Sequence, residues 1–265
     1  MMFSKPKFWD DKIEIFSIIL FPFTLITLIF IFLKKKFTKK IKFNIPIICV
    51  GNIYIGGTGK TPTSILLAKE LSRLKKNPVI VRKYYKNHED EHELIKSNFK
   101  NLILDNSRIA GINEAIKMNY DTVILDDGFQ EYKIKNKINI ICFNQHQLIG
   151  NGLVLPSGPL RESLKSLNNA NIILINGEED GNFEKKILKI NKNLKIFYSF
   201  YKPLNIEQFK KKKLVALASI GNPNNFFKLL NDYNLKVKKK LVYPDHYKFS
   251  DKQIKNIIFE AEKDD

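Results

Sequence analysis

Short apolar runs and longer amphipathic runs alternate along most of the chain. The apolar runs are nearly continuous, which is typical of strands that are covered on both faces of a sheet. They occupy residues 45–50, 78–82, 101–104, 122–125, 138–143, 171–175, 195–198, 214–218 and 236–242. Helix-like runs lie between them at residues 61–75, 109–118 and 226–232, and another follows at 253–263. This alternation predicts an α/β fold built on a parallel sheet.

The order of these runs also predicts where the chain divides. Tyr201, Lys202 and Pro203 follow the seventh strand-like run, and proline disfavours continuation of the preceding element. A new strand–helix–strand series begins after them. We therefore expect a core domain over residues 44–200 and a second, smaller α/β domain over residues 201–265, with residues 1–43 as a separate N-terminal segment.

The N-terminal segment contains the longest uncharged run of the chain. No charged residue occurs from 15 to 33, and a helix of that length spans roughly 28 Å, close to the hydrocarbon thickness of a bilayer. Lysines follow at positions 34, 35, 36, 39, 40 and 42, as is typical of the cytoplasmic side of a membrane. We expect a membrane-associated helix, either spanning or lying in the interface because Pro22 can kink it. A buried core helix is the alternative.

The net charge of +18 arises from 45 Lys and Arg against 27 Asp and Glu. A basic balance suggests nucleic acid, an anionic membrane or a phosphate-bearing substrate. Only four of these residues are arginines, at positions 73, 82, 108 and 161, and base readout favours arginine. We therefore expect no nucleic-acid partner. The two cysteines, Cys49 and Cys142, lie within apolar runs, which indicates buried side chains rather than a disulfide framework or zinc site.

A glycine-rich segment connects the first strand to the following helix. Four of the 12 glycines lie between Gly51 and Gly59, directly before Lys60 and Thr61. Glycines allow backbone N–H groups to converge on phosphate oxygens, with a lysine for the β- and γ-phosphates and a hydroxyl for Mg²⁺. The strict phosphate-loop pattern has glycine where this chain has Tyr54. The strand–loop–helix context still predicts a P-loop NTPase-like core that binds ATP.

Two carboxylates end the run at 122–125. Asp126 and Asp127 would lie at the carboxyl edge of the sheet beside the glycine-rich loop, where α/β folds bind ligands. With Thr61 they are the expected Mg²⁺ ligands. Because side chains alternate along a strand, the two carboxylates cannot both face one ion. We expect both near the site, in different roles.

These motifs carry a resemblance to a known family. Gly51-Asn52, the segment from Gly56 to Pro62, and Asp126-Asp127-Gly128-Phe129-Gln130 resemble the tetraacyldisaccharide 4'-kinases of the lipid A pathway. Further matches are Gly150-Asn151-Gly152, Leu155 to Glu162, Ser219 to Pro223 with Phe226-Phe227, and Asp245-His246-Tyr247. The same family has a membrane-associated helix before its kinase body.

The resemblance implies transfer of the ATP γ-phosphate to the 4'-hydroxyl of a tetraacyldisaccharide 1-phosphate, which yields lipid IVA at the cytoplasmic face of the bacterial inner membrane. It implies Asp90, paired with His246, as the group that orients or deprotonates the hydroxyl, with Lys60 and Asp127 as further catalytic residues. The expected nucleotide-binding residues are Gly51, Asn52, Gly56, Gly57, Thr58, Gly59, Lys60 and Thr61. The expected substrate-binding residues are Arg82, Gln130, Arg161 and Glu162.

The sequence departs from the family pattern at several positions. Val81-Arg82-Lys83-Tyr84-Tyr85 replaces the usual Ser-Arg-Gly-Tyr-Gly, and Glu89 and His92 flank the loop that carries Asp90 where Gly and Pro are usual. The family's Thr-Glu-Lys-Asp motif and closing helix do not follow residue 263, so we expect a truncated second domain. Two other functions stay open: a membrane-tethered P-loop ATPase switch that recruits a partner, and a truncated, non-catalytic binder of lipid or nucleotide.

Overall fold

The computed structural model describes residues 6–10, 13–86, 88–135, 137–221, 223–244 and 247–263. The chain forms two compact units, a larger one over Lys5–Ser199 and a smaller one whose main part begins at Phe200.

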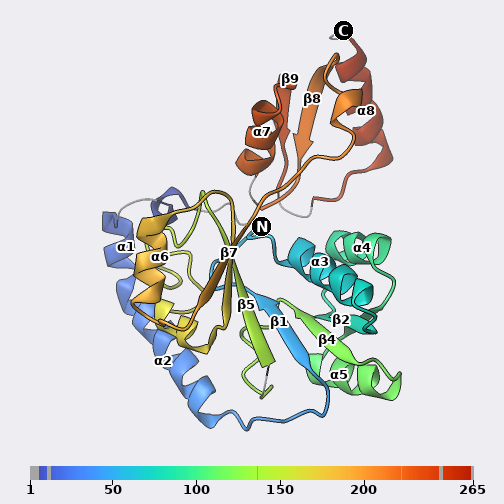
Figure 1. Cartoon of the computed structure of the whole chain (residues 1–265). Coiled ribbons are helices and arrows are strands. Elements are labelled where there is room, and N and C mark those ends of the chain that lie inside the picture. Colours follow the sequence, from blue (N-terminus) through green and yellow to red (C-terminus); the bar gives the residue numbers. More distant parts are fainter. Residues whose placement is uncertain are drawn as a thin grey trace. The chain divides into compact units, whose positions relative to one another are not determined.

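A seven-stranded parallel sheet forms the centre of the larger unit (Figure 1), with the strand order β3-β2-β4-β1-β5-β6-β7. Its strands are β1 (Ile47–Gly51), β2 (Pro78–Lys83), β3 (Leu102–Asp105), β4 (Thr122–Asp126), β5 (Lys137–Asn144), β6 (Ile172–Asn176) and β7 (Lys195–Ser199). Each corresponds to a predicted apolar run, with small shifts at the ends. The predicted parallel α/β sheet is confirmed.

Both faces of the sheet are covered, as the continuous apolar runs predicted. The helices of the larger unit after the first strand are α3 (Lys60–Arg73), α4 (Glu89–Asn98), α5 (Arg108–Lys117) and α6 (Gly181–Leu188), with a 3-10 turn, η2, over Leu164–Asn169. Val50, Ile80 and Ile124 pack with α3 and α4 in one core. Their strand neighbours, such as Cys49 and Val81, pack in a second core with α5 and α6. This alternation follows the twofold period of a strand.

Helix α4 differs from the sequence-based expectation. The segment that carries Asp90 was predicted as a loop, but Asp90 lies in the first turn of this helix. Three acidic residues, Glu89, Asp90 and Glu91, stand in that turn, where they interact favourably with the helix dipole. His92 and Ile95, three residues apart, are the buried side chains that attach the helix to the core. The helix was not predicted because the run is short and mostly polar, with few apolar positions to reveal a helical period.

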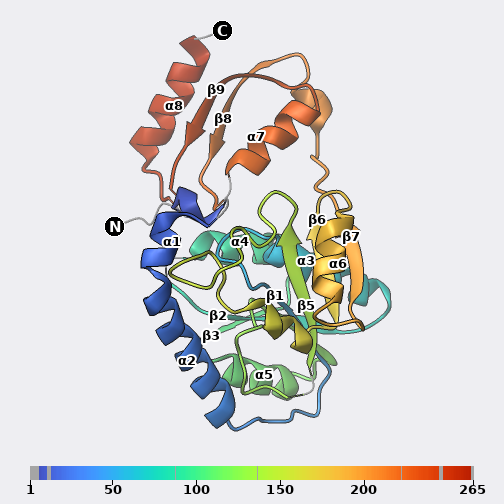
Figure 2. The ribbon, with the colours of Figure 1, turned by 90° about the vertical axis from the view of Figure 1, so that its left-hand side faces the viewer.

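The predicted single helix over residues 15–33 is instead two helices, α1 (Ile15–Ile19) and α2 (Phe21–Phe37), preceded by a 3-10 turn, η1 (Lys7–Trp9). The break at Leu20 comes directly before the first turn of α2, where Pro22 is tolerated because no intrahelical N–H bond is needed there. Figure 2 shows both helices along one side of the larger unit. Among the described residues, no helix has both the length and the apolar character required to cross a bilayer.

Hydrogen bonds attach this N-terminal segment to the loop over residues 150–162. The Asn151 amide donates to the carbonyl oxygen of Phe8 (3.1 Å) and to the hydroxyl of Ser17 (3.1 Å). The buried Thr24 hydroxyl donates to the carbonyl oxygen of Val154 at 3.1 Å. Trp9, also buried, donates its indole N–H to the carbonyl oxygen of Pro156 at 3.0 Å. One face of the N-terminal segment is therefore specifically packed against this loop.

The smaller unit contains a two-stranded parallel sheet of β8 (Lys213–Ala218) and β9 (Lys236–Val242). Its helices are α7 (Pro223–Asp232) and α8 (Asp251–Lys263), with a 3-10 turn, η3, over Ile206–Gln208. Ala216, Ala218 and Phe227 form its buried core. These elements agree with the predicted strands at 214–218 and 236–242 and with the predicted helices.

Candidate functional site

The glycine-rich loop lies between β1 and α3 at the carboxyl edge of the sheet. Gly59 has φ +86° and precedes the first residue of α3, and Gly56 has φ +106°. These are left-handed conformations that glycine adopts without steric cost. The Asn52 amide spans the loop, donating to the Thr58 hydroxyl at 2.9 Å and to the Gly56 carbonyl oxygen at 3.3 Å. No side chain caps the N-terminus of α3, so its first N–H groups are suited to an anion.

The segment after β4 packs closely against the start of this loop. A Cβ atom at Gly51 would lie 2.6 Å from Cβ of Phe129, so the close approach requires glycine. The Gln130 side-chain amide donates to the Asn52 carbonyl oxygen at 2.9 Å. Gln130, an expected substrate-binding residue, therefore contacts the backbone of the glycine-rich loop and supports its shape.

Asp126 is fully buried at the end of β4 and accepts three donors. The hydroxyls of Thr61 and Ser64 lie 3.1 and 2.9 Å from its two oxygens. The third donor is the Arg82 guanidinium at the end of β2, which forms an ion pair with the same carboxylate. A hydroxyl and a carboxylate are the hard oxygen ligands that Mg²⁺ prefers, so Thr61 and Asp126 fit a divalent cation.

Asp127 faces a different group of cations. Its φ of +54° turns the chain out of the extended conformation of β4. The Lys60 amine lies 3.7 Å from its carboxylate, and the Arg161 guanidinium lies 2.9 and 3.2 Å from its two oxygens. The Arg108 guanidinium donates to its backbone carbonyl oxygen at 2.6 Å.

The electrostatics of this cluster reflect its burial. Burial opposes ionisation of Asp127, but Lys60, Arg161, Arg108 and Arg82 outweigh it and lower the pKa of Asp127 from 3.8 to about 2. Burial lowers the pKa of Lys60, and the negative charge of Asp127 opposes that shift. Lys60 and Asp127 thus each compensate for the loss of hydration of the other.

Of the two residues expected to form the general base, Asp90 and His246, the structure describes only Asp90. Asp90 lies on the exposed part of the first turn of α4, one residue before Glu91. His246 and its neighbour Asp245 lie outside the described residues. The structure therefore places Asp90 on the helix that also contacts Arg82, because the side chain of Glu91 forms an ion pair with that guanidinium.

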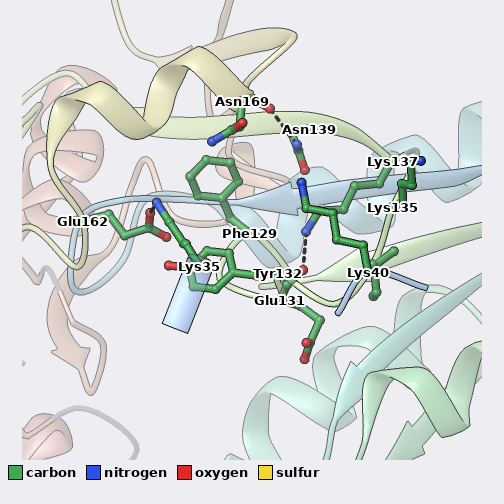
Figure 3. A pocket seen from close by; sticks show the side chains of 11 residues that line it. Lys35, Lys40, Phe129, Glu131, Tyr132, Lys135, Lys137, Asn139, Glu162 and Asn169 are labelled. Atoms are coloured by element: carbon green, nitrogen blue, oxygen red, sulfur yellow. Dashed lines mark hydrogen bonds and ion pairs between the residues drawn. The ribbon is translucent and has the colours of Figure 1, made fainter. Parts of the chain in front are cut away.

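The larger unit also contains a cavity of about 400 Å³ (Figure 3). It is lined by four lysines, two carboxylates, two amides and three apolar or aromatic side chains: Lys35, Lys40, Lys135, Lys137, Glu131, Glu162, Asn139, Asn169, Phe129, Tyr132 and Ile134. Two of its side chains are close in sequence to the cation cluster, because Glu162 follows Arg161 and Phe129 follows the Asp127-Gly128 turn, whereas Lys137 and Asn139 belong to the amino-terminal end of β5. Lysines supply positive charge, and the aromatic rings supply flat apolar surface. This chemistry fits a phosphorylated sugar.

Within this cavity, Glu162 links the expected substrate site to the N-terminal segment. Its buried carboxylate forms an ion pair with Lys35 of α2 and accepts a hydrogen bond from Tyr132. The Lys35 amine lies 5.0 Å from the centre of the Tyr132 ring. One carboxylate oxygen of Glu162 is buried with no hydrogen-bond partner among the described residues, which leaves an acceptor for a ligand in the cavity.

Two side chains of the cluster had no role assigned from the sequence. Ser64 follows Thr61 by three residues, so it lies on the same face of α3 and contacts Asp126. That helical spacing is a usable signal. No comparable signal in the sequence identifies Glu91, because its contact with Arg82 depends on the packing of α4 against β2.

Comparisons with known proteins show the family of the chain. The family model described as Tetraacyldisaccharide-1-P 4'-kinase matches residues 16–265. The Tetraacyldisaccharide 4'-kinase of Pelagibacter ubique (strain HTCC1062) is 41% identical over 99% of this chain and 84% of that protein. The corresponding protein of Wigglesworthia glossinidia brevipalpis is 32% identical over 94% of this chain and 73% of its own length.

A solved structure shares the fold. The crystal structure of the "apo" form of LpxK from Aquifex aeolicus in complex with ATP superposes with a TM-score of 0.69 and 25% identity, covering 89% of this chain and 84% of that one. The resemblance inferred from the motifs is confirmed. The chain belongs to the tetraacyldisaccharide 4'-kinase family and acts as a tetraacyldisaccharide 4'-kinase in lipid A biosynthesis.

Proposed function

We propose that this phosphotransferase uses ATP and Mg²⁺ at the glycine-rich loop. The observation that carries the proposal is the convergence of Lys60, Thr61, Asp126 and Asp127 at one edge of the sheet, where the N-terminus of α3 has no side-chain cap. An ATP complex of the Aquifex aeolicus relative supports the choice of nucleotide. The loop would be the phosphate-binding loop of a P-loop NTPase-like core.

Phosphoryl transfer depends on positioning and charge neutralisation more than on covalent chemistry. Lys60 is placed to contact the β- and γ-phosphates. Arg161, which is paired with Asp127, can turn from that carboxylate toward the transferred phosphoryl group. Thr61 and Asp126 would hold Mg²⁺, and Asp127 would instead orient Lys60 and Arg161. Bound there, the ion would supply positive charge beside the phosphate oxygens.

Asp90 is the proposed catalytic base, paired with His246. A carboxylate orients an imidazole ring and raises its basicity. The pair would accept the proton of the 4'-hydroxyl as that oxygen bonds to the γ-phosphorus, while the bond from the γ-phosphorus to the bridging oxygen breaks and ADP leaves. Asp90 is exposed at the N-terminus of α4, where a sugar hydroxyl can approach it.

The basic cavity is the proposed binding site for the sugar phosphate. Glu162 and Asn139 each have a buried oxygen with no hydrogen-bond partner among the described residues, and these oxygens can accept from sugar hydroxyls. Lys40 and Lys135 form no ion pair within the described part of the chain and can face the 1-phosphate. Arg161, the chain neighbour of Glu162, would lie between this cavity and the phosphoryl-transfer site.

Helices α1 and α2 are the proposed contact with the cytoplasmic face of the bacterial inner membrane. Phe23, Ile26, Phe30 and Phe32 are all exposed, although they are large and apolar. Lysines in the last turn of α2 lie where they can meet anionic headgroups. A substrate with acyl chains in the bilayer would then present its sugar headgroup near the cavity beside Lys35.

The direct test is transfer of labelled γ-phosphate from ATP to tetraacyldisaccharide 1-phosphate in detergent micelles. The intact chain should label the lipid, and Asp90→Asn should lower kcat by about 10²- to 10⁴-fold, the usual contribution of a general base. Glu93→Gln, an exposed carboxylate of the same helix, is the control and should label lipid at the parental rate. Full activity of Asp90→Asn would exclude Asp90 as the base.

A further inference from the structure

The Arg82 guanidinium lies between two carboxylates from different elements. One of its terminal nitrogens forms an ion pair with Asp126 and lies 3.3 Å from the Thr61 hydroxyl. The other terminal nitrogen forms an ion pair with Glu91 of α4 and lies 3.3 Å from Nδ1 of His88. The side chain is only 5% exposed. Arg82 therefore connects the carboxyl edge of β4 with the first turn of α4.

The first of these contacts uses the same oxygens that are proposed to hold the divalent cation. A guanidinium and a metal ion compete for the lone pairs of one carboxylate, because each requires direct contact with them and they repel each other at short distance. Cation binding at Thr61 and Asp126 therefore requires Arg82 to withdraw from Asp126. While Arg82 withdraws from Asp126, its contact with Glu91 can either persist or change geometry.

We propose that Arg82 relays occupancy of the cation and nucleotide site to α4, and that Glu91 is the positioning residue that receives it. Asp90 is adjacent to Glu91 in the same turn, so a displacement of the Arg82–Glu91 pair moves the proposed base. The proposal rests on the function proposed above and assigns a role to Glu91. In the nucleotide-free protein, Arg82 also neutralises the buried charge of Asp126.

The rest of α4 is attached to the core without Glu91. His92 is buried and stacks on the Tyr84 ring, with centroids 5.4 Å apart, and Ile95 is fully buried among β-strand side chains. The side chain of Glu91 is 30% exposed. Removing its charge should leave the helix in place, so Glu91→Gln tests positioning rather than folding.

Amide hydrogen exchange of the full chain, with and without Mg²⁺ and a non-hydrolysable ATP analogue, measures the relay. In the parental protein, the analogue should slow exchange in both α3 and α4. In Glu91→Gln it should still slow exchange in α3, whereas the response of α4 should be lost. Glu93→Gln, two residues further along the helix, is the matched control and should keep both responses.

Kinetics supply the second readout. Misplacement of a reacting group by about 1 Å costs roughly 10²-fold in rate, so Glu91→Gln should lower kcat by about that factor while KM for ATP stays unchanged. Arg82→Lys keeps the charge but has no forked head to bridge both carboxylates, and it should show the same loss. Retention of the α4 response, or of parental kcat, in both variants would overturn the proposal.

Mn²⁺ binding to the nucleotide-free protein, followed by electron paramagnetic resonance of free Mn²⁺, tests the competition itself. Arg82→Gln should bind Mn²⁺ more tightly, by about tenfold or more, because Asp126 loses its competing cation. Arg73→Gln, an exposed arginine on α3, should bind as the parental protein does, and equal affinity in Arg82→Gln would contradict the relay. The hydrogen-exchange and Mn²⁺-binding readouts need no lipid, so failure of lipid transfer in the parental protein would refute the proposed function alone.

Discussion

Two consecutive carboxylates, Asp126 and Asp127, have separate partners because the backbone turns between them. Asp126 is the last residue of β4 and points toward Thr61 and Ser64. Asp127 has φ +54° and points toward Lys60 and Arg161. The alternation rule predicts that the two do not face one ion. Their different partners follow from the left-handed residue that ends the strand.

The depressed pKa of Asp127 has a consequence for stability. Its value of about 2 in the folded protein lies below the ordinary 3.8, so its ionisation stabilises the fold above pH 4 by about 2 kcal/mol. This contribution is lost as the pH falls toward 2. Asp127→Asn should therefore lower the free energy of unfolding by a similar amount from pH 5 to pH 8, and by progressively less in more acidic solution.

Urea denaturation at a series of pH values measures this difference. Glu93→Gln controls for the simple removal of a surface carboxylate. A destabilisation by Asp127→Asn that grew on acidification would have the wrong sign and would show that the cations around Asp127 do not stabilise its charge.

Gly51 provides a second prediction at this scale. An added methyl group would lie 2.6 Å from Cβ of Phe129, and overpacking of this kind costs about 1–3 kcal/mol. Gly51→Ala should lower the Tm measured by calorimetry. Gly57→Ala is matched to it, because nothing lies within 4 Å of a Cβ atom at that position, and it should leave Tm nearly unchanged. Equal Tm values for the two variants would refute the steric argument.

At the scale of elements, the loop over residues 150–162 serves two purposes. Its last two residues, Arg161 and Glu162, face the cation cluster and the basic cavity. Its earlier residues hold the N-terminal segment through Asn151 and Ser157. The backbone N–H of Arg161 also donates to the carbonyl oxygen of Ile53 at 2.7 Å. A single loop thus joins the N-terminal segment to the glycine-rich loop.

Asn151→Ala tests this junction. The amide donates to Phe8, Ser17 and Ser157, and leaving these partly buried acceptors without a donor should cost about 1–3 kcal/mol in unfolding free energy. Amide exchange in α1 should become faster as well. Asn182→Ala, at an exposed position in α6, is the control. Unchanged exchange in α1 would mean that Asn151 does not secure the segment.

At the scale of the whole molecule, the chain combines exposed apolar side chains on α1 and α2 with a net charge of +18. Apolar burial in a bilayer is insensitive to salt, whereas attraction to anionic headgroups is screened within about 10 Å at 0.1 M salt. The two contributions can therefore be separated by ionic strength.

The membrane prediction uses vesicle sedimentation. The chain should bind vesicles that contain anionic lipid more tightly than neutral vesicles, and the difference should shrink as salt is added. Changing Lys34 and Lys36 together to glutamine should weaken anionic binding by roughly 30-fold, at about 1 kcal/mol per lysine. The same change at Lys211 and Lys212 in the smaller unit is the control. Equal binding to neutral and anionic vesicles would exclude the electrostatic contribution.

Much of the fold was predictable from the sequence because the determining patterns are local. Nine apolar runs predict the strands that the described residues form, and the glycine-rich segment before Lys60 and Thr61 predicts the loop between β1 and α3. The motifs also identify the family. In each case neighbouring residues contain the information, since a twofold apolar period or a glycine at a left-handed position needs no distant partner.

The tertiary structure decided how separate segments meet. Arg82 lies between Asp126 and Glu91, and Gln130 contacts the backbone of the glycine-rich loop, and neither contact could be read from the sequence. Helix α4 and the break at Leu20 were likewise missed. The sequence by itself determined the strands, the glycine-rich loop and the family. Only packing between distant segments fixed the partner of each charge, because buried ions must pair with whichever opposite charges the fold places beside them.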